Sequence, residues 1–212
     1  MLKNLKLWGI VAAVALNLAF AGSASAGLAF EGTIAEWAAG SNPVVNGDKD
    51  FMYLDASAEM VAANPTVSIA QVGTQYTASF SFGVGGQDGP FSGWIQYSVT
   101  ITDPNFVFNG VEVDSTHLGS GNSSVQKDID WGVLGVDVSI TSSNGSTDST
   151  FATAGQVTLL VTDYVTIDGA SNIASFVNTF TQTENVPEPA TLAMLVGIGA
   201  MGLFRRNRRN GN

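Results

Sequence analysis

The sequence predicts an all-β protein, an antiparallel β-sandwich of the jelly-roll type, with a short non-sandwich segment at each end. Segments that alternate apolar and polar residues recur through the middle of the chain, and stretches rich in Gly, Ser and Asn separate them. Strands with one apolar face that recur between such turns are typical of sandwiches and barrels. The chain has 212 residues, enough for one ordinary domain with short appendages.

The clearest strand pattern is QYTASFSFGV, residues 75–84, in which Tyr76, Ala78 and Phe80 share one parity and hydroxyl residues occupy the other. WIQYSVTIT, residues 94–102, alternates in the same way. A period of two indicates a strand with one buried face. The Gly-rich stretch at 83–93 is a predicted loop. We expect the two strands to pair as antiparallel neighbours through this long connection.

The rest of the body contains further predicted strands and one predicted helix. DSTHLGSGNSS and SSNGSTDS separate the later strands and are predicted turns. DASAEMVAAN is a predicted short helix with Asp55 or Ser57 as N-cap and Pro65 beyond its end. Residues 27–54 show no clean period and receive no prediction. The additional predicted strands cover residues 106–113, 136–140, 157–167 and 173–180.

The first 26 residues have the pattern of a secretory signal peptide. Lys3 and Lys6 precede an apolar stretch from Leu7 to Phe20, and small residues follow it. This order of charged, apolar and small-residue zones predicts export by the Sec machinery and cleavage between Ala26 and Gly27.

The body, residues 27–186, is strongly acidic. The chain has 18 acidic and 8 basic residues; the leader holds two lysines, and the segment from 187 holds one glutamate and four arginines. The body therefore keeps 17 acids against Lys49 and Lys127, a formal charge of −15. Nucleic acid is an unfavourable partner for such a body, because phosphate binding requires basic side chains.

The body offers few side chains for catalysis, and we expect it not to be an enzyme. There is no cysteine, and His117 is the single histidine, placed in a predicted loop without a Gly-x-Ser-x-Gly elbow nearby. Two acidic pairs, Asp48 with Asp50 and Asp128 with Asp130, leave a polysaccharide hydrolase as an alternative, because paired carboxylates hydrolyse glycosides.

A binding module is a further alternative. The oxygen-rich segments NGDKD, residues 46–50, and DYVTIDGASN, residues 163–172, suit a structural calcium ion, although no ligand set or other cofactor is predicted. Trp37, Trp94 and Trp131 are candidates for carbohydrate contact where they are exposed.

The C-terminal segment, residues 187–212, has three parts in a fixed order. Pro187, Glu188 and Pro189 precede an apolar run from Ala190 to Phe204, and Arg205, Arg206, Arg208 and Arg209 follow it. A helix over this run measures about 22 Å at about 1.5 Å per residue, which is shorter than the roughly 30 Å hydrocarbon core. A short transmembrane helix of this kind suits temporary retention, with the arginines on the cytoplasmic side.

These three features resemble the PEP-CTERM sorting signal, which exosortases of Gram-negative bacteria recognise. The resemblance covers Val186 to the end of the chain. It implies that the protein is held in the inner membrane through its tail, that Glu188 between its prolines is the recognised feature, and that the arginines stop translocation. It also implies cleavage near Pro187 to Pro189 and delivery to the cell surface or an extracellular matrix.

The sequence thus favours an exported, non-enzymatic surface or matrix protein. By resemblance to other carriers of the signal, we expect an association with exopolysaccharide and with biofilm or floc formation. The bodies of such proteins vary widely, so the resemblance does not extend to residues 27–186. The hydrolase and the carbohydrate- or calcium-binding module remain the alternatives.

Overall fold

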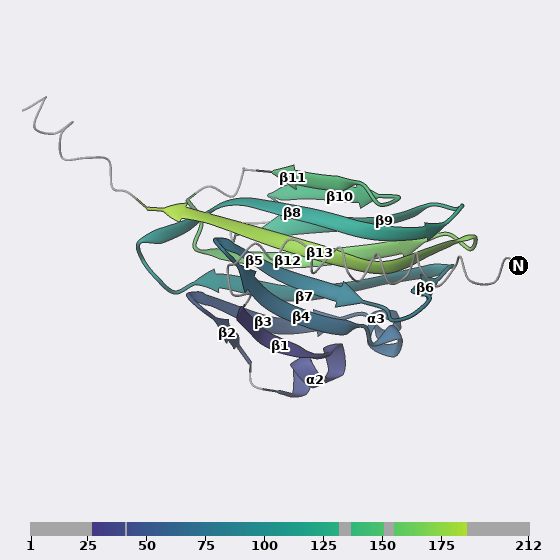
Figure 1. Ribbon diagram of the computed structural model, residues 1–212, viewed down its shortest axis with the longest axis horizontal. Coiled ribbons are helices and arrows are strands. Elements are labelled where there is room, and N and C mark those ends of the chain that lie inside the picture. Colours follow the sequence, from purple (N-terminus) through teal and green to yellow (C-terminus); the bar gives the residue numbers. More distant parts are fainter. Residues whose placement is uncertain (1–26, 41, 132–136, 151–154, 186–212) are drawn as a thin grey trace, which may run out of the picture.

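The computed structural model describes residues 27–40, 42–131, 137–150 and 155–185, and in them two antiparallel sheets pack face to face (Figure 1). The predicted antiparallel β-sandwich is therefore confirmed. The strands are β1 Gly27–Thr33, β2 Val44–Asn46, β3 Lys49–Ala56, β4 Thr66–Val72, β5 Gln75–Ser81, β6 Gln87–Asp88, β7 Phe91–Ile101, β8 Phe106–Gly119, β9 Ser123–Asp130, β10 Val138–Ser143, β11 Thr147–Thr150, β12 Thr158–Ile167 and β13 Ser171–Glu184; the helices are α2 Ile34–Ala39 and α3 Ala58–Ala63.

The strand order is that of a jelly roll with additional strands at one side. Sheet A runs β1-β4-β5-β13-β8-β11, with β6 paired to β13, and sheet B runs β10-β9-β12-β7-β3-β2. The eight strands β5 and β7 to β13 form two four-stranded layers, and apart from the β9–β10 hairpin each successive pair of them lies in different sheets. Eight antiparallel strands in two interleaved Greek keys define the jelly roll.

Aromatic side chains from both sheets fill the space between the layers. Phe80 of β5 stacks on Phe176 of β13, with ring centres 4.6 Å apart. Tyr97 of β7, in sheet B, lies edge-on to Phe180 of β13, in sheet A, at 6.4 Å. Trp37 of α2 closes one side of this cluster, 5.7 Å from Tyr97. Buried aromatic pairs of this kind add to the burial of their own apolar area.

The expected pairing of the strands at 75–84 and 94–102 is wrong. Both strands exist, as β5 and β7, but β5 lies in sheet A and β7 in sheet B. The loop between them crosses from one sheet to the other. Alternation identifies the buried face of a strand and contains no information about its neighbour.

The turn predicted at 114–124 is also wrong over most of its length. β8 extends to Gly119 and β9 begins at Ser123, so only three residues form the turn. β8 pairs with β13 along this whole stretch. The backbone N–H and C=O groups of residues 114–119 can form hydrogen bonds with β13 whatever the polarity of their side chains, so a polar composition does not exclude a strand.

The short helix predicted at 55–64 is confirmed as α3, with Ser57 as its N-cap. The Ser57 hydroxyl accepts a hydrogen bond from the Met60 amide at 3.2 Å. Asn64 ends the helix in the left-handed conformation, with a φ of 44°. Asp55 instead belongs to β3.

Both terminal predictions, the signal peptide with its cut at Ala26 and the sorting segment from residue 187, concern residues that the structure does not describe. In the part of the chain that is described, no helix has the length and apolar character needed to cross a membrane.

Candidate functional site

The most distinctive surface in the described part of the chain is the outer face of sheet B. Val125, Lys127 and Ile129 of β9 are buried between the sheets, so their neighbours along the strand point outward. The same alternation holds on β12 and β7. The residues that we call the sheet B face are Trp94, Gln96, Gln126, Asp128, Thr162 and Tyr164.

Two aromatic residues lie side by side at the centre of the sheet B face. Tyr164 of β12 is directly opposite Trp94 of β7 in the strand register, and Gln126 of β9 is opposite Tyr164 on the other side. Tyr164 is 42% exposed, and Trp94 is partly exposed. Directly opposed side chains on one face lie close enough to form a continuous surface. An exposed aromatic surface suits a ligand that has both an apolar face and polar edges.

Amide, hydroxyl and carboxylate groups surround the aromatic pair in fixed orientations. The Gln96 carboxamide donates to the Thr162 hydroxyl at 3.1 Å. The Asp128 carboxylate accepts from the Gln126 carboxamide at 2.9 Å and from the Ser139 hydroxyl at 2.7 Å. These bonds order polar side chains beside the rings, where they serve as donors and acceptors for a polyhydroxylated ligand.

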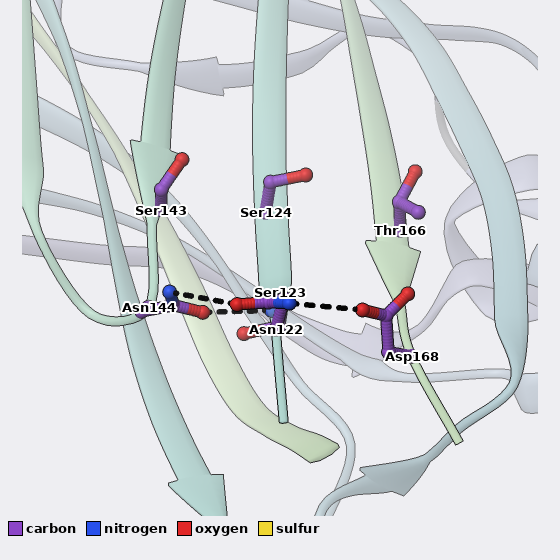
Figure 2. Close-up of a pocket in the computed structure, with 7 residues that line it drawn as sticks. All are labelled: Asn122, Ser123, Ser124, Ser143, Asn144, Thr166 and Asp168. Carbon is purple, nitrogen blue, oxygen red and sulfur yellow. Dashed lines mark hydrogen bonds between the residues drawn. The ribbon is translucent and has the colours of Figure 1, made fainter. Parts of the chain in front are cut away.

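A polar pocket of about 310 Å³ lies at one end of this face (Figure 2). Figure 2 shows Ser124, Ser143 and Thr166 on three adjacent strands, with Asn122, Asn144 and Asp168 below them. The Asn122 carboxamide donates to Asp168 at 3.2 Å, which ties the ends of two strands together. Ser124 and Thr166 are each two residues from Gln126 and Tyr164 on their strands, so the pocket continues the sheet B face.

The two acidic pairs suggested by the sequence are arranged differently from each other. Asp128 and Asp130 lie two apart on β9, on the outward-facing parity. Asp48 lies in the turn between β2 and β3, where it contacts Lys49, whereas Asp50 is a residue of β3. The structure therefore places only the Asp128 and Asp130 pair on one strand face.

His117 lies on β8 and not in a loop as expected. Its Nδ1 is 2.6 Å from the Ser123 hydroxyl and 3.2 Å from the Ser171 hydroxyl. Both serines are buried, with 4% of their surface exposed. Neither hydroxyl is therefore open to a substrate, and this arrangement does not resemble a nucleophile with its base.

The three tryptophans suggested for carbohydrate contact occupy three different environments. Trp37 is completely buried, so that suggestion is wrong for it. The ring closes the core beside Tyr97, which stabilises the attachment of α2 to the sandwich. Trp131 packs partly against the core at the end of β9. Trp94 alone belongs to the sheet B face.

The two segments suggested for calcium each contain a carboxylate that is paired with a lysine. Asp48 lies 2.7 Å from Lys49 Nζ. Asp163 is buried, 3.6 Å from Lys127 Nζ. Among the residues that the structure describes, no cluster of three His, Cys, Asp or Glu side chains is arranged to hold a metal ion.

Comparisons with known proteins identify the tail. The PEP-CTERM protein-sorting motif matches residues 185–209, and no curated protein matches the sequence. Among solved structures, TmCBM61, determined in complex with β-1,4-galactotriose, aligns with 66% of this chain and 90% of its own, at 12% identity and a TM-score of 0.33. A carbohydrate-binding module of family 29 aligns with 80% of this chain and 99% of its own, at 10% identity and a TM-score of 0.21.

The motif match confirms what the proline, apolar and arginine pattern predicted. It covers the C-terminal segment and leaves the sandwich unclassified. A PEP-CTERM motif implies an exported protein and processing by exosortase-type machinery. The chain therefore carries, at residues 185–209, a PEP-CTERM protein-sorting motif.

Proposed function

We propose that this protein is a non-enzymatic component of the cell surface or extracellular matrix that binds polysaccharide through the sheet B face. The observation that supports the proposal is the pair formed by Trp94 and Tyr164, exposed side by side and surrounded by ordered amides and hydroxyls. The apolar face of a sugar ring packs on such rings while its hydroxyls bond to the polar border. An extended face suits a chain of sugars better than a single one.

The polysaccharide that this surface favours is neutral. Lys49 and Lys127 are the only basic side chains between residues 27 and 186, and both are completely buried. The accessible charged groups of the described body, apart from its single histidine, are thus carboxylates. A polymer rich in uronic acids or sulfates would be repelled over distances of about 10 Å at an ionic strength of about 0.1 M, and over longer distances at lower ionic strength.

A hydrolase is the weaker candidate. Its best residues, Asp128 and Asp130, lie on the same face of one strand. Glycosidases place their two carboxyl groups on opposite sides of the scissile bond, across a cleft. We therefore expect that replacing both aspartates with asparagine leaves polysaccharide chain length, measured by reducing ends, the same as with the wild-type protein.

The proposed route to the surface follows from the two ends of the chain. The signal peptide directs the chain to the Sec machinery, and the tail holds it briefly in the inner membrane. An exosortase then cuts near Pro187 to Pro189 and releases the sandwich to the surface or to an exopolysaccharide matrix, where it supports biofilm or floc formation. Deletion of Arg205 to Arg209 together with Pro187 and Pro189 should prevent this delivery. Cell fractionation measures the result, because the variant should be absent from the surface and matrix fractions.

Affinity gel electrophoresis tests the binding proposal. The exported protein is run through gels that contain soluble neutral polysaccharides, namely galactan, glucomannan and xyloglucan, and a uronic-acid polymer as the anionic comparison. We expect at least one neutral polymer to retard the wild type, and Trp94→Ala or Tyr164→Ala to weaken that retardation about tenfold in apparent Kd.

The control for these variants is Thr179→Ala, because Thr179 lies on the outward parity of β13 in sheet A, on the opposite side of the sandwich. This variant should bind as the wild type does. A doubly substituted Trp94→Ala, Tyr164→Ala protein that folds and still binds with unchanged affinity would exclude the sheet B face as the site.

A further inference from the structure

A cluster of four polar side chains lies inside the sandwich, away from the sheet B face. Lys127 of β9, Asp163 of β12 and Tyr97 of β7 extend from sheet B, and Asn178 of β13 extends from sheet A. All four residues are completely buried. Charged residues are almost never fully buried unless they are paired, so this cluster requires an explanation.

The Asp163 carboxyl group lies between an amine and a carboxamide. Its Oδ1 is 3.6 Å from Lys127 Nζ, and its Oδ2 accepts a hydrogen bond from Asn178 Nδ2 at 2.6 Å. The same Asn178 nitrogen lies 2.8 Å from the Tyr97 hydroxyl. Lys127 Nζ is 4.8 Å from the ring centre of Phe180, two residues beyond Asn178 on β13. The amine therefore extends across the core towards the strand that carries the carboxamide.

The cluster is incompletely hydrogen-bonded. Lys127 Nζ, Asp163 Oδ1 and Asn178 Oδ1 have no hydrogen-bond partner among the described residues. Lys49, the other buried lysine, provides the contrast, since its Nζ donates to Asp48 at 2.7 Å and to the Gln182 carboxamide. These two hydrogen bonds explain how Lys49 is accommodated inside the protein. Lys127 lacks such bonds among the described residues, and a buried charge with poor partners is costly.

Burial also shifts both pKa values in the direction that a reaction would need. It lowers the pKa of Lys127 to about 8 and raises the pKa of Asp163. Both shifts favour a neutral amine beside a neutral carboxylic acid over an ion pair. Burial raises the pKa of Tyr97 as well, so its hydroxyl remains a donor.

We propose that Lys127 and Asn178 condense to form an intramolecular amide bond between the two sheets, with Asp163 as the group that transfers the proton. The amine is the nucleophile, the side-chain carboxamide is the electrophile, and the acid between them contacts both. No oxidant, nucleotide or second protein is required. This proposal is independent of the carbohydrate-binding proposal, because none of its residues belongs to the sheet B face.

The step balances as an exchange of one amide for another. The Nζ lone pair of Lys127 attacks Cγ of Asn178, and the carbonyl π electrons move to Oδ1. Before this attack, a half-turn of the carboxamide exchanges Oδ1 and Nδ2, which lets protonated Asp163 and the Tyr97 hydroxyl both donate to the carbonyl oxygen and polarise it. Asp163 then passes a proton from Nζ to Nδ2, the Cγ–Nδ2 bond breaks, and ammonia leaves. The mass falls by about 17 Da, that of the lost ammonia.

Such a bond would replace a disulfide in a chain that has no cysteine. It links β9 to β13 and closes a loop of about 50 residues, and cross-links that close long loops restrict the unfolded chain most. Burial of all four residues would shield the product from hydrolysis. Outside the cell, intracellular chaperones cannot refold a protein that has unfolded. A covalent link that resists unfolding would therefore benefit an exported protein.

Trypsin gives a direct test on the exported protein, because residues 27–186 contain no arginine and only two lysines. After denaturation we expect a cut after Lys49 and none after Lys127, since an acylated lysine is not a trypsin site. The intact protein should weigh about 17 Da less than its sequence. The cut after Lys49 is the internal control for digestion.

Two variants and one matched control complete the test. Lys127→Met and Asp163→Asn should restore the full sequence mass, and Asp163→Asn should also restore the cut after Lys127. Lys49→Arg should keep the deficit of about 17 Da. A cut after Lys127 in the denatured wild type, with full sequence mass, overturns the proposal even if every variant fails to fold. A deficit of about 18 Da also overturns it, because loss of water would identify Asp163 as the acylating group.

Discussion

At the scale of single residues, Asp48 and Lys49 show how this protein keeps a charge at the edge of its core. The Asp48 carboxylate accepts from Lys49 Nζ at 2.7 Å and from the Tyr76 hydroxyl at 2.6 Å. Lys49 Nζ also lies 4.2 Å from the centre of the Tyr76 ring. Burial lowers the pKa of Lys49, and the hydrogen bond and charge of Asp48 oppose that shift, so the pair stabilises a lysine whose own surface is completely buried.

Replacing Asp48 with asparagine should remove part of the acid sensitivity of the protein. Burial alone would raise the pKa of Asp48, but the bonds from Lys49 and Tyr76 hold that pKa below its ordinary value of 3.8. A carboxyl group with a lowered folded-state pKa contributes stability above pH 3.8, and this contribution is lost as the pH falls through the folded-state pKa.

Urea unfolding between pH 7 and pH 2.5 measures this effect. The difference in unfolding free energy between the wild type and Asp48→Asn should be constant near neutrality and should narrow as the pH falls below about 4. Asp50→Asn serves as the control, because it removes a neighbouring carboxylate of β3 and leaves the Asp48–Lys49 ion pair in place. A difference that stays constant down to the lowest pH would show that the folded-state pKa of Asp48 is not lowered.

The residues of the candidate site were only partly predictable. The sequence indicated Trp94 as one of three tryptophans but did not single it out from Trp37, whose environment depends on how α2 packs. Tyr164 gave no signal of its own. A signal did exist for the buried cluster, because Lys127 and Asp163 occupy the same parity as Val125 and Val161. Charged residues at core positions of a strand indicate a buried polar site.

At the scale of elements, the corner between β10 and β11 depends on one glycine. Asn144 and Gly145 both have positive φ, 52° and 81°, and this turn carries the chain from sheet B to sheet A. A Cβ on Gly145 would lie 3.4 Å from the Ser115 carbonyl oxygen. Gly145→Ala should therefore lower the unfolding free energy by about 1 kcal/mol through backbone strain.

Chemical denaturation checks this prediction, with Gly169→Ala as the matched control. Gly169 lies in the turn between β12 and β13, has no positive φ, and has ordinary space around it, with its nearest contact to an added Cβ at 3.8 Å. That variant should be neutral or slightly stabilising, because alanine restricts the unfolded chain. Equal losses in both variants would mean that the corner is not the strained position.

The strands that alternate cleanly were predictable, and their partners were not. β5, β7, β12 and β13 were each predicted because valines and aromatic residues mark their buried faces. β9 was missed, since Lys127 occupies a core position within it. α2 was missed although its capping box is present in the sequence: Thr33 accepts from the Glu36 amide at 3.2 Å, and Glu36 accepts from the Thr33 amide at 2.7 Å. Strand neighbours depend on long-range packing that a local period does not encode.

At the scale of the whole molecule, the charge distribution is more one-sided than the composition suggests. The body holds 17 acidic residues and two lysines, and both lysines are inside the sandwich. Each lysine faces one aspartate, at 2.7 Å and 3.6 Å, so neither offsets the remaining carboxylates of the body. The formal charge follows from composition alone, but the burial of the lysines depends on which strand face each one occupies.

Salt should stabilise this protein, because it screens repulsion among the surface acids. Raising NaCl from about 10 mM to about 150 mM shortens the Debye length from about 30 Å to about 8 Å. We expect the Tm of the exported protein to rise by a few degrees over this range, as measured by a thermal melt. A Tm that falls with salt would show that attractive surface pairs outweigh the repulsion.

The same melt, repeated with EDTA at constant ionic strength, separates screening from a bound ion. Asp48 and Asp163, which belong to the two segments suggested for calcium, already face lysines at 2.7 Å and 3.6 Å. We therefore expect EDTA to leave the Tm unchanged. An ion held only by the folded state would raise stability in proportion to the logarithm of its concentration. A drop in Tm on chelation that added calcium reverses and added sodium does not would show that the folded protein binds calcium. Part of the stabilisation by salt would then come from ion binding and not from screening.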